Sequence, residues 1–509
     1  MTTQIGRPLT LSDVVSVAMG AGRVELGQGV GDAMAPARAV VEEAVASGRA
    51  VYGITTGLGD LANVRIDSTE SRELQEAVLR SHATAVGDPL PTDVVRAMLL
   101  LKARTFALGA SGVRVELVER LALMLNERIH PVVPSQGSLG ASGDLALLAH
   151  LGLPLIGEGL VETKGEILPA AEALRRYGIE PHELSYKEGL ALVNGTEGML
   201  AMGILGAAAA RGLARAADVT AAMTLEACLG TDRAFDADLV GLRKHPGALE
   251  VASNLRNLLS GSAIVASHRD SDHLVQDAYS LRCIPQVHGA YRDALDYVET
   301  TMGWELDSAI DNPSVITSTG EVRSGGNFHG ESLALALDHL GLLLAGFGTI
   351  AERRVARLVD PDLSNGLPPF LTTDAGRRNG FMIAQYTAAS LVGESRSLCF
   401  PASSDSIPTS AGQEDHVSMG ATAGRKALQI LANSERVVAI EALAAAQGLD
   451  LRHPLRPGPA TGAALDRVRS VSPFLDDDRP LSAEIEHVRE LIASGELVEA
   501  VERAAGRLS

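Results

Sequence analysis

The chain has 509 residues, a formal net charge of −19, and a composition that is 46% hydrophobic but only 3% aromatic. The negative charge argues against a nucleic-acid or anionic-membrane partner, because such a partner would need a basic face. The three cysteines are widely spaced and predict neither a disulfide framework nor a zinc site. The N-terminus has no apolar signal core and no stretch is typical of a membrane span, so we expect a cytoplasmic protein.

The first part of the chain alternates helical patterns with glycine-containing loops. A capping-box pattern at residues 10–13 predicts a first helix, and a second is expected over 36–46. Residues 51–61 contain three glycines and no helical periodicity, which predicts a loop that carries Tyr52. Three further helices are expected, over residues 72–81, 92–107 and 113–128. Thr92 is expected to cap the middle one of these three.

Residues 137–145 read Gly-Ser-Leu-Gly-Ala-Ser-Gly-Asp-Leu and form an unusual loop. No bulky side chain crowds this backbone, so the amide nitrogen of Gly143 can meet the carbonyl of Ala141. Ring closure, with loss of water from the ring and from the Ser142 hydroxyl, would leave a methylidene-imidazolone, an electrophile that no standard side chain supplies. An isolated Ala-Ser-Gly is ordinarily a plain turn, so the surrounding sequence must decide between a plain turn and a segment that cyclises.

Long apolar helices are predicted for much of the remaining chain. Residues 198–229 are nearly all small and apolar, which predicts a buried bundle helix. Further long helices are expected over 332–359 and 421–447, and Gly448 is expected to end the latter. The sequence thus predicts an all-α fold. Its expected domains are an N-terminal domain (1–195), a central long-helix bundle (196–450) and a small helical appendage (451–509).

Several polar or aromatic residues in the second half are candidates for binding. Tyr279 and Arg282 are three apart and would share a helix face, where a guanidinium is a natural fork for a carboxylate, although a lone Arg is more often a surface residue. Phe328 is ordinarily a core residue. No second and third ligand accompany His329 at metal spacing, so no metal is predicted. The Glu-Asp-His run at residues 414–416 is ordinarily a solvated face.

The motifs at residues 52–59, 137–145 and 279–287 resemble those of the histidine and aromatic amino acid ammonia-lyases. The resemblance extends from residue 51 to Gly448, with the motifs in the family's order. It implies a long-helix bundle of the ammonia-lyase/fumarase-like type, assembled as a homotetramer. It also implies a 4-methylidene-imidazol-5-one prosthetic group formed autocatalytically from the segment Ala141-Ser142-Gly143, with no nucleotide and no required metal.

The same resemblance assigns roles to residues from distant segments. Tyr52 is expected to be the general base or acid, and Tyr279 to complete the catalytic group around the prosthetic residues. Arg282 and Asn194 would hold the substrate carboxylate. The full set of expected substrate-binding residues is His82, Asn194, Gln276, Arg282, Phe328 and Glu414. Family members usually have Gln or Asp where this chain has Glu197.

Glu414 is the main reason to prefer histidine as the substrate. A carboxylate pairs with an imidazole N–H but would be costly against a bare phenyl ring. His82 is compatible with histidine or tyrosine. The expected products are trans-urocanate and ammonia; a tyrosine ammonia-lyase or an aromatic aminomutase on the same scaffold is the alternative. A non-catalytic binding protein would be expected to have lost the Ala-Ser-Gly loop, Tyr52 or Arg282, and all are intact.

Overall fold

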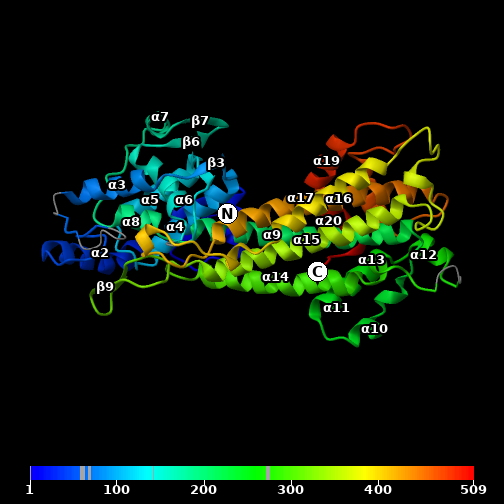
Figure 1. Cartoon of the computed structure of the whole chain (residues 1–509), viewed down its shortest axis with the longest axis horizontal. Coiled ribbons are helices and arrows are strands. Elements are labelled where there is room, and N and C mark those ends of the chain that lie inside the picture. The colour runs from blue at the N-terminus through cyan, green and yellow to red at the C-terminus, as the bar shows by residue number, and fades with distance from the viewer. Residues whose placement is uncertain (1, 58–63, 67–69, 141–142, 271–274) are drawn as a thin grey trace. The chain divides into compact units, whose positions relative to one another are not determined.

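The computed structural model describes residues 2–57, 64–66, 70–140, 143–270 and 275–509, which fold into two compact units (Figure 1). The units interleave along the sequence. Unit 1 comprises Met1–Leu205, Glu299–Asp338 and Pro401–Arg425. Unit 2 comprises Gly206–Val298, His339–Phe400 and Lys426–Ser509. The predicted helical architecture is confirmed, and each described strand is only two to four residues long.

Unit 1 combines short helices with small sheets. Its helices are α1 (Leu11–Ala18), α2 (Val30–Ala46), α3 (Ser71–His82), α4 (Thr92–Ala107), α5 (Val115–Asn126), α6 (Leu145–Gly152), α7 (Ala170–Arg176) and α8 (Glu188–Val193). Its strands are β1 (Thr2–Ile5), β2 (Arg23–Leu26), β3 (Val86–Pro89), β4 (His130–Pro131), β5 (Pro134–Gln136), β6 (Leu160–Thr163), β7 (Glu166–Pro169), β8 (Ser314–Ile316) and β9 (Glu321–Arg323). Strands β1 and β2 pair in parallel, whereas β3–β5, β4–β6–β7 and β8–β9 are antiparallel.

Three helices of unit 1 pack on one another and position the candidate site. Helices α3, α6 and α8 are mutual neighbours. Their apolar faces are buried, for example Leu79 on α3, Leu148 on α6 and Leu192 on α8. The burial of these faces fixes the three helix ends relative to one another. His82 at the end of α3, Leu145 at the start of α6 and Asn194 just after α8 are thereby brought to one place.

Four long helices extend through both units: α9 (Glu197–Ala227), α14 (Ile284–Leu306), α15 (Glu331–Val359) and α17 (Gly420–Leu451). Within unit 2 they pack side by side (Figure 1). Unit 2 also contains α10 (Ala237–Gly241), α11 (Pro246–Leu258), α12 (Ala263–Ser267), α13 (Tyr279–Arg282), α16 (Met382–Leu398), α18 (Pro459–Arg469), α19 (Ser482–Ala493) and α20 (Glu496–Ala505).

Buried ion pairs link the long helices inside unit 2. Arg354 on α15 contacts Glu441 on α17, and both side chains have no exposed surface. Glu441 also accepts hydrogen bonds of 2.9 Å from the hydroxyls of Thr220 and Thr224 on α9. Each oxygen of this buried carboxylate therefore has donors from two neighbouring helices. Buried carboxylates require such partners because they have lost their hydration.

Three predicted helix ends are wrong. Helix α2 begins at Val30, so Pro36 lies inside it and not at its start. Thr92 is the first helical residue of α4, and its hydroxyl donates to Glu162 Oε2 at 2.8 Å instead of capping the helix. Helix α17 continues past Gly448 to Leu451. A Cβ at Gly448 would lie 2.9 Å from Ala227 Cβ, so this glycine permits close helix packing and does not end the helix.

Helices α9 and α15 are more apolar than expected from the sequence analysis, in which no stretch was typical of a membrane span. By length and hydropathy alone, both helices could cross a membrane. However, 72% of the most apolar window of α9 and 56% of that of α15 are buried inside the protein. A helix that is buried on several sides is apolar on several sides, which accounts for the hydropathy. The prediction that the segment over 198–229 is a buried bundle helix is confirmed.

Candidate active site

The loop at residues 137–145 packs against the turn at Gly195. The loop residues Ala141 and Ser142 lie outside the described residues. Gly143 has a φ of +76°, and a Cβ built on it would lie 1.8 Å from the carbonyl oxygen of Gly195. The amide of Asp144 donates to that same oxygen at 2.7 Å. No residue other than glycine fits at 143, because both the conformation and the close approach forbid a side chain.

The other end of this loop is fixed as tightly. A Cβ at Gly140, whose φ is +72°, would lie 2.0 Å from Ser418 Oγ. The Ser138 hydroxyl donates to Asp144 Oδ1 and accepts the amide of Gly140, both at 3.2 Å. The amide of Met419 donates to the carbonyl of Leu139 at 2.9 Å. The two flanks of the Ala-Ser-Gly segment are thus held in a closed arrangement by side chains and backbone from elsewhere in unit 1.

Asp144 is fully buried directly after the loop. Burial is the main cause that raises its pKa, to about 7, and the nearby carboxylate of Glu197 adds to the effect. The amide of Met199 donates to Asp144 Oδ2 at 2.9 Å and opposes the rise. A carboxyl group whose pKa is raised this far by burial is more common at functional sites than elsewhere.

A cavity of about 440 Å³ in unit 1 gathers four of the predicted site residues: Tyr52, His82, Asn194 and Glu414. Its walls are largely apolar, with Leu190 from α8 and Leu145 from α6 among them. Leu145 begins the helix that follows the glycine loop, so the cavity reaches the first residue of α6. A mainly apolar cavity with a few convergent polar groups is the usual form of a small-molecule site.

His82 and Glu414 form the polar side of this cavity. Burial lowers the pKa of His82, while the carboxylate of Glu414 opposes that change. The Ser81 hydroxyl lies 3.0 Å from His82 Nδ1. Thr409 donates its hydroxyl to Glu414 Oε2 at 3.1 Å, and the two residues also pair through their backbones. The loop that carries Glu414 is thus ordered locally and presents its carboxylate near an imidazole.

Asn194 is held on two sides. Its side-chain Nδ2 donates to the carbonyl of Asn312 at 2.8 Å, and only 4% of the residue is exposed. Its backbone carbonyl accepts a hydrogen bond of 2.6 Å from Lys102 Nζ. Nδ2 carries two hydrogens, so its second hydrogen and the side-chain oxygen are left for a ligand in the cavity.

The remaining predicted residues lie elsewhere. Phe328 is half-buried in unit 1 but does not line this cavity. Gln276, Tyr279 and Arg282 belong to unit 2. The expectation that Tyr279 and Arg282 share a helix face is confirmed, because the Arg282 guanidinium carbon lies 4.7 Å from the centroid of the Tyr279 ring.

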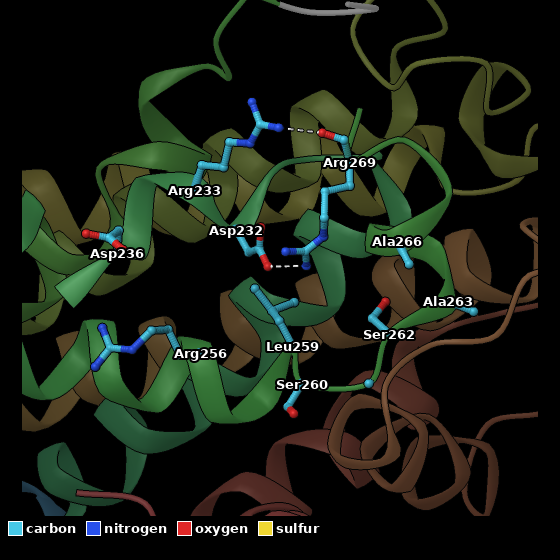
Figure 2. Close-up of a pocket in the computed structure, with 11 residues that line it drawn as sticks. Asp232, Arg233, Asp236, Arg256, Leu259, Ser260, Ser262, Ala263, Ala266 and Arg269 are labelled. Atoms are coloured by element: carbon cyan, nitrogen blue, oxygen red, sulfur yellow. Dashed lines mark hydrogen bonds and ion pairs between the residues drawn. The ribbon is translucent and has the colours of Figure 1, made fainter. Parts of the chain in front are cut away.

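A larger cavity of about 850 Å³ lies in unit 2 and is a weaker candidate for catalysis (Figure 2). Arg269 donates to Asp232 Oδ2 at 2.7 Å, and Arg233 donates to the Arg269 carbonyl at 2.7 Å. Arg256 donates to the Phe235 carbonyl, and Asp236 caps α10. These charged groups are already satisfied by protein partners, and none of the predicted site residues lines the cavity.

The expectation that His329 lacks companion ligands is wrong. The fold brings Glu331 and His416 to it, with the potential ligand atoms within 4.8 Å of one another. The two imidazole rings are stacked, with an angle of 3° between their planes. Zinc with bonds of about 2.0–2.1 Å in a tetrahedral site draws its ligand atoms to about 3.3 Å apart. The group therefore has suitable residue types without the geometry of a formed metal site.

Sequence reasoning missed Lys102 and the two serines at the cavity, Ser81 and Ser410. Lys102 follows the apolar run Leu99–Leu101 on a helix that is buried over most of its length. A cation in such a position must have a buried partner, because an unpaired buried charge is very costly. That signal was available in the sequence, whereas serines at a cavity edge carry none.

The chain matches the family described as aromatic amino acid lyase over residues 9–470. It is 52% identical over 503 residues to a protein named histidine ammonia-lyase from Gloeobacter violaceus, which covers 99% of this chain and 98% of that relative. The histidine ammonia-lyase of Trypanosoma cruzi has a crystal structure that superposes with a TM-score of 0.91 at 40% identity, covering 99% and 96% of the two chains. Tyrosine aminomutase from Streptomyces globisporus gives 0.94 at 37% identity, covering both chains completely. Since the match extends over nearly the whole sequence and the fold agrees throughout, this chain belongs to the aromatic amino acid lyase family.

Proposed function

We propose that this chain eliminates ammonia from L-histidine to give trans-urocanate, as a carbon–nitrogen lyase. The observation that carries the proposal is that Glu414 and His82 line one cavity and interact electrostatically there, beside Tyr52 and Asn194. The relatives named histidine ammonia-lyase, at about half identity over nearly the full chain, support the same substrate.

The cavity offers an imidazole ring a complementary polar end. The carboxylate of Glu414 would accept the imidazole N–H of the substrate. Because burial lowers the pKa of His82 below its ordinary 6.5, its ring is neutral at pH 7 and can donate to or accept from the other imidazole nitrogen. A phenyl ring would satisfy neither group and would leave both of them desolvated.

Tyr52 would take the β-proton, and a second group of residues would hold the substrate carboxylate. In a site assembled from several subunits of a homotetramer, Asn194 of one subunit and Arg282 of another would bind the carboxylate, with Tyr279 and Gln276 completing the polar surroundings. Arg282 Nε is buried and has no hydrogen-bond partner among the described residues, which suits a group that awaits an anionic ligand. Fixing both ends of the substrate would place its β-carbon against the base.

The segment Ala141-Ser142-Gly143 is proposed to carry the methylidene-imidazolone. The described flanks fit a ring at this place, because Gly143 has no space for a side chain and both ends of the loop are held by unit 1. Once formed, the group supplies an electrophile that withdraws electron density from the leaving amine. No nucleotide and no metal is required in this scheme.

We also propose that the active protein is a cytoplasmic homotetramer. Unit 2 exposes large apolar side chains that a monomer would leave in water: Tyr297, Leu342, Ile383, Tyr386 and Phe400, exposed by 46%, 49%, 59%, 62% and 73%. In a homotetramer, the neighbouring subunits would cover these side chains, as partners cover contiguous apolar patches. Sedimentation velocity should give a mass four times that of the chain.

The test of the proposed reaction is an ultraviolet assay of the purified protein with L-histidine, L-tyrosine and L-phenylalanine in parallel. We expect urocanate from histidine and no coumarate or cinnamate. Coumarate or a β-amino acid from tyrosine would instead support the alternative that the aminomutase structures suggest. A protein that is inactive on all three and retains its unmodified mass would overturn the prosthetic-group assignment.

A further inference from the structure

A buried ion pair lies directly beneath the turn that contacts the glycine loop. Lys102 on α4 and Glu197 at the start of α9 are 2.9 Å apart, with side chains that are 0% and 3% exposed. Lys102 Nζ also donates to the Asn194 carbonyl at 2.6 Å, and Thr105 donates its hydroxyl to Glu197 Oε1 at 3.1 Å. The ammonium group is therefore held between a carboxylate and one particular peptide carbonyl.

Stability alone does not account for this pair. Replacing a buried ion pair with apolar side chains of similar volume is often neutral or stabilising, because burying two charges is costly. The position of the pair is more informative. Its cationic end holds the peptide unit that joins Asn194, a residue of the cavity, to Gly195, which contacts the prosthetic loop.

The turn at Gly195 has little freedom to move. Gly195 has a φ of +141°, and a Cβ on it would lie 2.1 Å from Glu197 Oε2 and 2.7 Å from Lys102 Nζ. On its other side, the carbonyl of Gly195 accepts the amide of Asp144 and lies against Gly143. A shift of the Asn194–Gly195 peptide would therefore move the cavity amide and the glycine loop together.

We propose that Lys102, with Glu197 as its counter-ion, is a positioning residue that fixes the Asn194–Gly195 peptide, so that the loop at 140–144 is held for ring closure and Asn194 faces the substrate. Lys102 does not touch the substrate; it acts through the two segments that its neighbours hold. The proposal rests on the proposed function for its catalytic consequence. Its structural part concerns maturation of the loop and is separate from the proposed function.

The experiment compares Lys102→Met/Glu197→Gln with Arg354→Met/Glu441→Gln as a matched control. Both double variants neutralise a fully buried pair, but the control pair lies in unit 2 and contacts no predicted site residue. Each protein is analysed by intact mass, which reports the two waters lost on ring closure. Thermal unfolding, and kcat and KM on L-histidine, complete the comparison.

We expect the Lys102→Met/Glu197→Gln protein to fold but to retain a fraction of chains with the unmodified mass. Its kcat per mature chain should fall on the order of 100-fold, as expected for misplaced reacting groups. The control should mature completely and keep kcat within about threefold of the parent, whatever its melting temperature. Complete maturation with an unchanged kcat in the Lys102 variant, or equal losses in both double variants, would overturn the proposal.

Thr105→Val tests the positioning role of the Lys102–Glu197 pair if the Lys102 double variant does not fold. It removes one hydrogen bond to Glu197 without changing any charge, so folding should persist. We expect a loss of about two- to tenfold in kcat with only a small fall in the melting temperature; an unchanged kcat would count against the proposal. If the parent protein itself keeps both waters, the proposed function fails, and that outcome is distinguishable from failure of the positioning role.

Discussion

Two buried carboxyl groups, Asp144 in unit 1 and Asp218 in unit 2, have opposite electrostatic environments although neither reaches solvent. Burial raises the pKa of both. At Asp218 this effect is more than offset by Arg292 and His288, each 2.7 Å away, and its pKa lies below the ordinary range. At Asp144 no cation compensates, the carboxylate of Glu197 adds repulsion, and the pKa rises to about 7.

The contrast separates a structural use of buried charge from a functional one. In unit 2 the buried carboxylate of Asp218 is neutralised by the cations that contact it, and the buried carboxylate of Glu441 is neutralised by Arg354. In unit 1 the pKa of Asp144, directly beside the glycine loop, lies well above its ordinary value. Groups with such shifted pKa values are concentrated at catalytic and binding sites. We therefore expect substitutions of the buried charges beside the glycine loop to affect maturation and turnover, and substitutions of the paired buried charges Asp218 and Glu441 in unit 2 to affect stability.

The largest expected effect belongs to Ser142→Ala. Without the hydroxyl that leaves as water, the exocyclic double bond of the ring cannot form. Activity on L-histidine should be almost completely lost while the melting temperature changes little, and intact mass should lack the loss of two waters that the parent shows. Ser410→Ala, at the edge of the same cavity, is the matched control and should remain active. Substantial turnover by Ser142→Ala would place the electrophile elsewhere.

A smaller loss is expected for Glu414→Gln. The change keeps the shape of the side chain but removes the charge that is proposed to bind the substrate imidazole and that acts on the ring of His82. Hydrogen bonds to charged groups are worth about 1.5–3 kcal/mol, so kcat/KM on L-histidine should fall about 10- to 100-fold. Glu321→Gln, an exposed carboxylate paired with Arg323, should leave kcat/KM unchanged. An equal response of both variants would remove the argument for histidine.

The sequence predicted most of what depends on local pattern. The long apolar helices and the glycine loop follow from composition and spacing, and the capping box at Thr10 is present as expected. The meeting of His82 with Glu414 has no local signature, because 332 residues separate them (414 minus 82) and only the fold brings them together. It was expected through family resemblance and not through periodicity.

Helix ends and buried ions were predicted less well for a physical reason. Pro36 and Gly448 are ordinarily helix boundaries, but tertiary packing overrode both, most clearly where Gly448 makes room for Ala227. Of the companions of His329, Glu331 lies two residues along the chain, whereas His416 comes from a segment more than eighty residues away. Interleaving of the two units along the chain likewise has no marker in the sequence, because long helices pass from one unit into the other.

Arg354→Met tests the other side of the comparison. It leaves Glu441 buried with only the two threonine hydroxyls as partners, and breaking one side of a buried pair costs about 3–5 kcal/mol. Denaturant unfolding should show this loss of stability, while the folded fraction keeps its prosthetic group and its kcat. Adding Glu441→Gln should recover part of the stability. A loss of kcat in the folded fraction would contradict the expectation that the Arg354–Glu441 pair serves stability alone.

The measurement that tests Asp144 most directly is the pH dependence of stability in Asp144→Asn. The pKa of Asp144 is raised in the folded protein from an ordinary 3.8 to about 7, so the folded state binds the proton more tightly than the unfolded state. The stability that this contributes is fully present below pH 3.8 and is lost as the pH rises through 7. Relative to the variant, the parent should therefore lose stability between about pH 4 and pH 8.

Even one unit of pKa difference corresponds to about 1.4 kcal/mol, which denaturant unfolding at several pH values can resolve. The asparagine can still accept the Met199 amide and donate to Ser138, so its own stability should lack this slope. Parallel curves for the two proteins would mean that Asp144 is ionised throughout, and the contrast with Asp218 would then be lost.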